Sequence, residues 1–395
     1  MPASGAYRKM EAKQMRLFRW SAILLALLLA AMAMVPIVSA DNYSKEKFNL
    51  VESNYISSDA AYKNAVMTMQ EFILSGSLNA KWDGATLNPQ PLVIYDLNGA
   101  ILTYQFTAEK NGMKIGVANS AASKIIGGPI LAIGMSPTNF EEKTIDSKIN
   151  GIISTTYLDY NILSKNIVAY QYPKLGVLVQ ISNSKTGEMK KIIIDVYDFS
   201  IIPEEKSVVE GTPGAWSFYD EMSLNQMNEN VQKWGNLQKS DMTPQYASEK
   251  TLSYTRYDQA SENWCAVAVA QMNSQFYEHS HTQQAIADIM GNGDGDGSTP
   301  EMELTYYQAS TESGGLDKQN SIDVYSSSAN WNNAADEIDA DRPLKVGNMG
   351  HARAIAGYKI QSGSNYLYIY DPNPSLTDPF WEMYTGTYNN YVYVR

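Results

Sequence analysis

The sequence predicts an α+β fold divided into two folded units. A chain of 395 residues exceeds the usual size of one domain. In each half a helical pattern comes first and strand patterns follow, which is typical of α+β domains and not of alternating βαβ units. With 44% hydrophobic and 18% charged residues, the chain can bury a core and is neither wholly disordered nor collagen-like.

The composition excludes several classes of protein. One Cys and three His rule out a disulfide within one chain and argue against a Cys/His zinc cluster. The net charge of −12, with no basic run, argues against a nucleic-acid partner. If the protein is a Cys-His enzyme, few pairings of thiol and imidazole are available.

The amino terminus is typical of a secretory signal peptide over residues 1–40. Basic residues come first, an apolar stretch covers 21–35, and small residues at 38–40 suit a cleavage site. A second interpretation is an uncleaved membrane anchor over 20–40, which is just long enough to span a bilayer. Pro36 and the small residues favour cleavage. Both interpretations place most of the chain outside the cytoplasm, as a secreted or membrane-tethered protein.

Residues 41–202 form the predicted α+β N-terminal domain. An apolar stripe at helical spacing runs over 62–73 and Gly76 follows it, which indicates a helix and its end. The next two strand patterns, PLVIYDL and ILTYQFTA, are joined through Asn98-Gly99, a strong hairpin signal. Further strand patterns are MKIGVA, NIVAYQYP, GVLVQIS and KKIIIDVYDF.

Residues 203–250 are predicted to be a linker, and 251–395 the second folded unit. The linker begins with a Pro-, Gly- and Glu-rich stretch and contains a polar helical pattern at about 217–235. In the second unit a helix starts near the single Cys, and LKVG, RAIAGYKI and YLYIY are strand patterns closer to its end.

Cys265 is the first candidate catalytic residue. It begins a helical pattern, and a thiol in the first turn of a helix is favoured as thiolate by the partial positive charge there. Gln259 lies six residues earlier, where its amide could donate to an oxyanion beside the sulfur. A buried structural cysteine is the alternative interpretation.

His351 and Asp371 complete the candidate site. His351 lies among small residues in NMGHARAIAG, and Asp371 ends the strand pattern YLYIY. Pairing of the two strands across residues 361–365 would bring the carboxylate against the imidazole. A base and an orienter are what an activated thiol needs. The alternative is a structural His with an unrelated Asp at a strand end.

These motifs, in this order, resemble a papain-like cysteine peptidase over residues 254–395. The similarity is greatest to the double-glycine leader peptidases (bacteriocin-processing, peptidase C39-like) and their secreted relatives. The pieces that carry it are Gln259, Trp264-Cys265 with the helix AVAVAQMNSQFY, MG…GSTPEMELTYY, GHARAIAGYK and YLYIYDPNP. The resemblance implies a papain-like fold in which Cys265 is the nucleophile, His351 the base, Asp371 the orienter and Gln259 an oxyanion donor. It also implies protein or peptide substrates.

Two features depart from the papain pattern. Trp precedes the Cys instead of following it, and Asp stands where papain uses Asn. The N-terminal domain is loosely similar to a streptopain-type propeptide, with GGPILAIG as the best local match. This predicts a zymogen in which residues 41 to about 245 occupy the catalytic cleft. A constitutive surface-binding or spacer domain is the alternative.

The loop GNGDGDGSTPEME suggests a calcium site. Asn292, Asp294 and Asp296 stand at positions 1, 3 and 5 of an EF-hand-like register, with Glu303 at position 12. Against calcium, position 1 is Asn, Pro300 takes position 9, and only one such loop is present. A solvated turn without metal is the alternative, and no cofactor is required for the predicted reaction.

The sequence therefore predicts an exported thiol protease, a hydrolase made as a zymogen. Two alternatives remain open. A transglutaminase-like acyl transferase shares the Cys-His-Asp order, and a surface-binding protein could retain an inactive peptidase fold.

Overall fold

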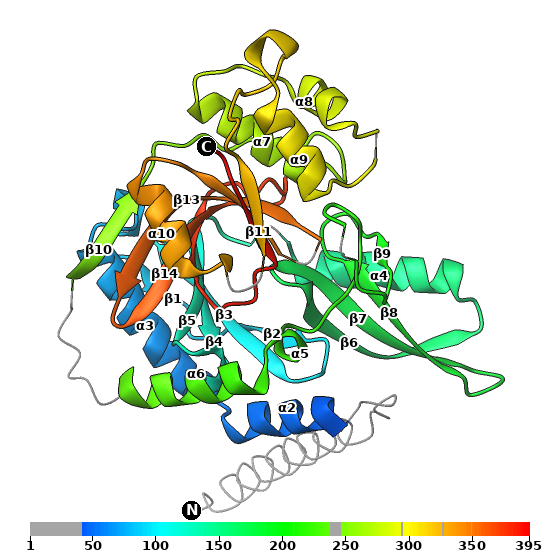
Figure 1. Cartoon of the computed structure of the whole chain (residues 1–395). Helices are drawn as coiled ribbons and strands as arrows, with labels where there is room; N and C mark the ends of the chain where they lie inside the picture. Colours follow the sequence, from blue (N-terminus) through cyan, green and yellow to red (C-terminus); the bar gives the residue numbers. More distant parts are fainter. Residues whose placement is uncertain are drawn as a thin grey trace, which may run out of the picture. The chain divides into compact units, whose positions relative to one another are not determined.

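The computed structural model describes residues 42–138, 140–207, 209–237, 246–293, 295–325, 328–348 and 350–395. The chain divides into two compact units, Met1–Glu46 and Lys47–Arg395, and the second contains almost all described elements (Figure 1). The predicted export signal over 1–40 and the alternative anchor over 20–40 lie outside the described residues. None of the described helices is long and apolar enough to cross a membrane.

The described α-helices are mostly short. They are α2 (Asn42–Ser53), α3 (Ser58–Leu74), α4 (Glu142–Thr156), α5 (Phe218–Glu221), α6 (Leu224–Leu237), α7 (Cys265–Phe276), α8 (Gln283–Met290), α9 (Pro300–Gln308) and α10 (Trp331–Asp339). Three 3₁₀ turns in the described part are Ala80–Trp82, Lys124–Ile126 and Thr311–Ser313.

The described strands belong to one extended, mostly antiparallel sheet of 16 strands. Before residue 203 they are β1 (Thr86–Leu87), β2 (Leu92–Asp96), β3 (Ile101–Lys110), β4 (Met113–Ala121), β5 (Ile130–Gly134), β6 (Tyr160–Gln171), β7 (Lys174–Asn183), β8 (Met189–Asp195) and β9 (Ile201–Ile202). After it they are β10 (Tyr246–Thr251), β11 (Ile322–Tyr325), β12 (Leu344–Gly347), β13 (Ala352–Gln361), β14 (Ser364–Tyr370), β15 (Phe380–Met383) and β16 (Asn390–Tyr393). The order along the sheet is β11-β16-β12-β13-β14-β15-β5-β4-β3-β2-β6-β7-β8-β9, with β1 on β3 and β10 on β13.

The N-terminal part, residues 47–202, contains the predicted helix and hairpin. Helix α3 starts after Ser57, whose side chain accepts a hydrogen bond from the Ala60 amide, and Gly76 follows it with φ +74°. Strands β2 and β3 pair antiparallel on either side of the Asn98-Gly99 turn, where Gly99 has φ +94°. Both predictions are confirmed, because local turn and cap chemistry decides them.

The C-terminal part, residues 251–395, packs helix α7 against strands β13 and β12. One face of α7, containing Cys265, Val269 and Met272, lies in the same buried cluster as three alanines of β13 (Ala352, Ala354 and Ala356). Small side chains on the strand allow the helix to approach closely. Strands β13 and β14 form the predicted hairpin, with Gln361 opposite Ser364.

The two parts are joined in one sheet. Strand β15 pairs antiparallel with β5, so that Trp381 lies opposite Ile133. Trp381 is buried and donates its indole N–H to the Ser77 carbonyl at 3.1 Å, and it lies within the hydrophobic core of the N-terminal part. The α+β class is confirmed. A separate N-terminal domain is not confirmed, since the sheet and the core continue from one part into the other.

Candidate active site

The single thiol lies at the start of helix α7, against the start of strand β13. Cys265 is the first residue of the helix and is only 1% exposed. Its Sγ accepts a hydrogen bond from the backbone N–H of Ala352 at 3.3 Å. Because Ala352 directly follows His351, the sulfur lies beside the candidate base.

His351 and Asp371 are hydrogen-bonded to each other. His351 Nε2 lies 2.8 Å from Asp371 Oδ1, and both side chains are buried. The Asn373 amide donates to the same carboxylate oxygen at 2.9 Å, and Arg256 Nε donates to the Asp371 carbonyl at 2.7 Å. With Nε2 held by the carboxylate, Nδ1 is the ring nitrogen left to face a thiol. The β13–β14 hairpin thus brings together two residues that are 20 positions apart.

The charge states of the three groups follow from their burial. Burial opposes ionisation of Asp371, but His351, Arg353 and the hydrogen bonds hold its pKa at about 2. Burial lowers the pKa of His351 and raises the pKa of the Cys265 thiol to about 12. At neutral pH the described state therefore contains a carboxylate, a neutral imidazole and a neutral thiol.

We expect Cys265 of the folded full-length chain to react slowly with iodoacetamide. At pH 8 a thiol whose pKa is about 12 is ionised about 10³-fold less than an ordinary thiol, and only the thiolate attacks. Mass spectrometry of the Cys265 peptide over time gives the rate, and the same protein unfolded in guanidinium chloride gives the reference. Equal rates in the folded and unfolded protein would contradict the burial argument.

Gln259 lies on the loop before α7, and its amide is engaged within that loop. Gln259 Nε2 donates to the carbonyls of Ser261 at 3.0 Å and Glu262 at 2.5 Å. Its backbone N–H donates to the Pro372 carbonyl at 2.9 Å, which ties the loop to the residue after Asp371. The structure therefore brings Cys265, His351 and Asp371 together and leaves the Gln259 amide directed at its own loop.

The predicted calcium loop contacts the segment just before Cys265. Trp264 Nε1 donates to the Gly293 carbonyl at 3.1 Å. The Asn292 amide nitrogen donates to the carbonyl of Gly297 at 2.9 Å and to Ser298 Oγ at 3.1 Å, so the loop is closed by its own hydrogen bonds. The loop is thus attached to the residue that directly precedes Cys265.

The predicted calcium ligands do not converge in the described residues. Glu303 is fully buried on helix α9, and its Oε1 lies 3.0 Å from the ammonium of Lys345. Asp296 Oδ2 accepts the Gly293 amide at 3.1 Å, and Asp294 lies outside the described residues. No group of three or more His, Cys, Asp or Glu among the described residues could hold a metal ion. A calcium site at this loop stays a prediction, and Glu303 faces a lysine instead of joining it.

The N-terminal part and the predicted linker reach the candidate site. The Gly211 amide donates to the Gly350 carbonyl, one residue before His351, at 2.7 Å, and Asn348 Nδ2 donates to the Tyr172 carbonyl at 3.0 Å. Gly350 has φ +83°, and a Cβ there would lie 2.8 Å from Gln171 Nε2. Sequence patterns gave no sign of these contacts beyond the small residues around His351, because they join segments far apart in the chain.

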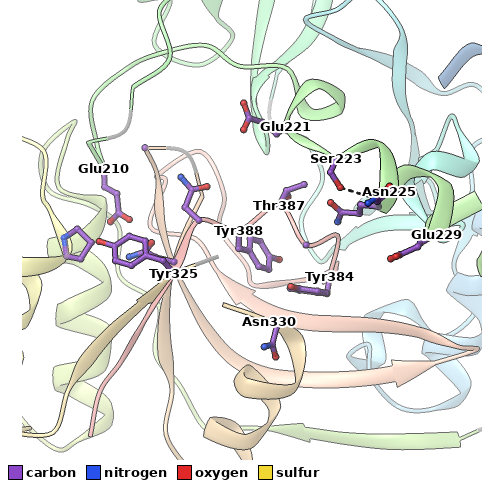
Figure 2. Close-up of a pocket in the computed structure, with 16 residues that line it drawn as sticks. Glu210, Glu221, Ser223, Asn225, Glu229, Tyr325, Asn330, Tyr384, Thr387 and Tyr388 are labelled. Atoms are coloured by element: carbon purple, nitrogen blue, oxygen red, sulfur yellow. Dashed lines mark hydrogen bonds between the residues drawn. The ribbon is translucent and has the colours of Figure 1, made fainter. Parts of the chain in front are cut away.

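A cavity of about 1060 Å³ opens next to this contact (Figure 2). Its charged lining residues are Glu210, Glu221 and Glu229, and Tyr325, Tyr384 and Tyr388 line it as well. Figure 2 shows Glu210 and Tyr325 at one side of the view and Glu229, from α6, at the other. Gly350 also lines the cavity, which therefore begins beside the candidate base.

Comparison with known proteins finds a family for the C-terminal part. Residues 251–395 match the model of the Peptidase_C39 like family, and the matched segment contains Cys265, His351 and Asp371. No curated protein matches the chain. The family points to a cysteine peptidase, a hydrolase that acts on proteins or peptides. We conclude that residues 251–395 form a peptidase-like domain similar to the Peptidase_C39 like family.

Proposed function

We propose that the protein is an exported cysteine peptidase that hydrolyses peptide bonds through Cys265, His351 and Asp371. The observation that carries the proposal is the 2.8 Å hydrogen bond between His351 Nε2 and Asp371 Oδ1, immediately beside the thiol. A carboxylate on one ring nitrogen sets the imidazole tautomer, which leaves the other nitrogen as a base for a nucleophile. The family match of residues 251–395 supports the same chemistry.

In the proposed reaction, the Cys265 proton passes to His351 Nδ1 and the sulfur attacks the carbonyl carbon of the scissile peptide bond. The C–N bond then breaks, the imidazolium protonates the leaving amine, and a thioester to Cys265 remains. Water, deprotonated by His351, attacks the thioester, releasing the new carboxyl terminus and the free thiol. Asp371 keeps the imidazole oriented and stabilises its positive charge at each stage.

Gln259 and the Cys265 backbone N–H are the proposed oxyanion donors. The amide at the start of helix α7 has no partner within the helix, which suits a negative oxygen. To donate to an oxyanion beside the sulfur, the Gln259 amide would have to break its hydrogen bonds to the carbonyls of Ser261 and Glu262. Such a rearrangement fits a site that is closed in the described state.

We also propose that the chain is made as a zymogen. The thiol and the imidazole are almost fully buried, and residues before 251 bind the segment that carries His351. The Gly211 amide donates to the Gly350 carbonyl, and the Tyr172 carbonyl accepts from the Asn348 side chain. Removal or displacement of these residues would expose the thiol and lower its pKa towards the ordinary range.

Analysis of the products tests the peptidase proposal. Purified full-length protein, and protein recovered from culture medium, are incubated with casein, and new amino termini are measured by amine labelling and mass spectrometry. We expect new termini with the native chain and none with Cys265→Ala. Crosslinks or ammonia release without new termini would instead support a transglutaminase-like enzyme, and no products at all from either preparation would support an inactive binding protein.

A further inference from the structure

A loop over residues 205–207 and 209–215, here called the cleft loop, carries the contact to the segment that contains His351. Its base is closed by a hydrogen bond from the Ala215 amide to the Glu205 carbonyl at 3.2 Å. Its tip is a tight turn in which the Thr212 amide donates to the Val209 carbonyl at 3.2 Å. The sequence suggests only a linker here, whereas in the structure the backbone from Val209 to Thr212 forms a defined turn.

The tip is held by backbone hydrogen bonds to two segments on either side of it, and one of these contacts is an isolated β-bridge. Glu210 and Ser298 form an antiparallel bridge, with the Ser298 amide donating to Glu210 at 2.9 Å and the Glu210 amide donating back at 3.3 Å. The next residue, Gly211, donates its amide to the Gly350 carbonyl at 2.7 Å. Pairing of this kind is a common way for a protein to hold an extended peptide. It places Gly211 next to the segment that carries His351.

Gly211 also lies against the segment that carries the nucleophile. A Cβ at Gly211 would lie 2.2 Å from the carbonyl oxygen of Asn263, two residues before Cys265, and the residue has φ +88°. The position therefore accepts glycine alone without rearrangement. Gly211 is held between the backbone just before the thiol and the backbone just before the imidazole.

The side chain of Glu210 enters a buried charged pocket. Glu210 is 5% exposed although Val209 beside it is 38% exposed, and its carboxylate contacts the ammonium of Lys345. Lys345 is fully buried in strand β12 and also contacts Glu303 at 3.0 Å and Asn390 Oδ1 at 3.4 Å. A buried ammonium needs a negative partner, because an unpaired charge is costly to bury.

Glu210 is one of two carboxylates that contact this ammonium, and Glu303 is the other. Burial raises the pKa of Glu303 to about 8, Lys345 opposes this rise, and Glu210 adds to it. Glu210 and Glu303 therefore share the one ammonium of Lys345, and the presence of Glu210 disfavours ionisation of Glu303. The contact with this ammonium favours an acidic side chain over a neutral one at the position of Glu210.

We propose that Lys345, Glu303 and Asn390 form a subsite that recognises an acidic side chain, and that Glu210-Gly211 of the cleft loop is its built-in occupant. The substrates of the enzyme would then be peptides that present an acidic residue followed by glycine. That such peptides are substrates rests on the proposed peptidase function. Their binding beside the thiol does not depend on that function. Because the chain turns back at Gly211, the loop lies against the segments just before the thiol and the imidazole instead of extending past them.

The reactivity of Cys265 tests the occupancy of the subsite by the loop. We expect Glu210→Gln in the full-length chain to increase the rate of iodoacetamide alkylation at pH 8 by about 10-fold or more, since a charged hydrogen bond holds the tip. Glu204→Gln is the matched control, because Glu204 is exposed and precedes the cleft loop, and it should leave the rate unchanged. Gly211→Ala should increase the rate as Glu210→Gln does, because its methyl group would collide with Asn263.

Protection of the thiol by peptides tests the specificity of the subsite without requiring turnover. In the Glu210→Gln protein, the capped peptide acetyl-Val-Glu-Gly-amide should slow alkylation at a concentration about 10-fold lower than acetyl-Val-Gln-Gly-amide does. Equal protection by the two peptides would overturn the acidic subsite. Equal alkylation rates in the native, Glu210→Gln and Gly211→Ala proteins, with native circular dichroism, would overturn the role of the loop.

These readouts separate the subsite from the catalytic proposal. Faster alkylation and selective protection, without any new amino termini from casein, would support the subsite and overturn the peptidase function. New termini from casein with unselective protection would do the reverse.

Discussion

Replacing His351 with Gln is expected to lower the rate of peptide-bond hydrolysis by about 10⁴-fold or more. The imidazole is the only described group that both lies beside Cys265 and is oriented by a buried carboxylate, through the 2.8 Å bond to Asp371. Glutamine has a similar polar reach but cannot accept the thiol proton at neutral pH. The rate constant kcat on a synthetic peptide that spans a bond cleaved in casein by the native enzyme measures the effect.

Asp371 should matter less than His351, because it acts by orienting the ring. We expect Asp371→Asn to lower kcat by about 10²–10⁴-fold, with a smaller effect on KM. Asp288→Asn is a matched control. Asp288 is exposed on α8, where its side chain accepts a hydrogen bond from Gln284 at 2.9 Å. An unchanged kcat in His351→Gln would exclude His351 as the base.

Replacing Arg353 with Met is expected to lower the free energy of unfolding by about 3–5 kcal/mol. Arg353 is fully buried on β13 and forms two hydrogen bonds to Glu382 on β15, of 2.8 Å and 3.0 Å. Without the guanidinium, the Glu382 carboxylate would remain buried and would lose both of these hydrogen bonds, while the hydroxyl of Tyr388 would still donate to it at 2.6 Å. Denaturation in guanidinium chloride, followed by tryptophan fluorescence, measures the loss.

Two further variants test whether the loss of stability comes from leaving the Glu382 carboxylate buried without its ionic partner. Lys185→Met breaks an exposed ion pair with Asp159, whose side chains are 72% and 50% exposed, and should cost less than about 1 kcal/mol. Adding Glu382→Gln to Arg353→Met should recover part of the loss, because no charge is then left buried and the Tyr388 hydroxyl keeps an acceptor. A double variant less stable than Arg353→Met would contradict this account.

The Arg353–Glu382 pair also connects stability with the candidate site. Arg353 lies two residues after His351, and Glu382 lies in the strand that pairs with β5 of the N-terminal part. The contact therefore lies between the strand beside the thiol and the junction of the two parts. A loosened pair is expected to disturb the active site and this junction together.

The local elements and the candidate triad could be predicted from the sequence. The Asn98-Gly99 hairpin, helix α3 with its Ser57 cap, and the β13–β14 hairpin depend on neighbouring residues, whose turn and cap preferences are local. The same hairpin brings His351 to Asp371, because the two residues flank paired strands. With one thiol in the chain, no other Cys could be chosen as the nucleophile.

Only the tertiary structure decided which distant groups meet. Glu303, which by its spacing suggested a calcium ligand, faces Lys345, and Glu210, in a stretch that suggested a linker, shares that lysine. Gly211 lies against the backbone segments that precede Cys265 and His351, and β5 and β15 join the two predicted units into one sheet. A sequence pattern specifies the faces of helices and strands but not the partner of a buried charge, which depends on long-range packing. The sequence thus determined the candidate chemistry, and the tertiary structure determined what covers it.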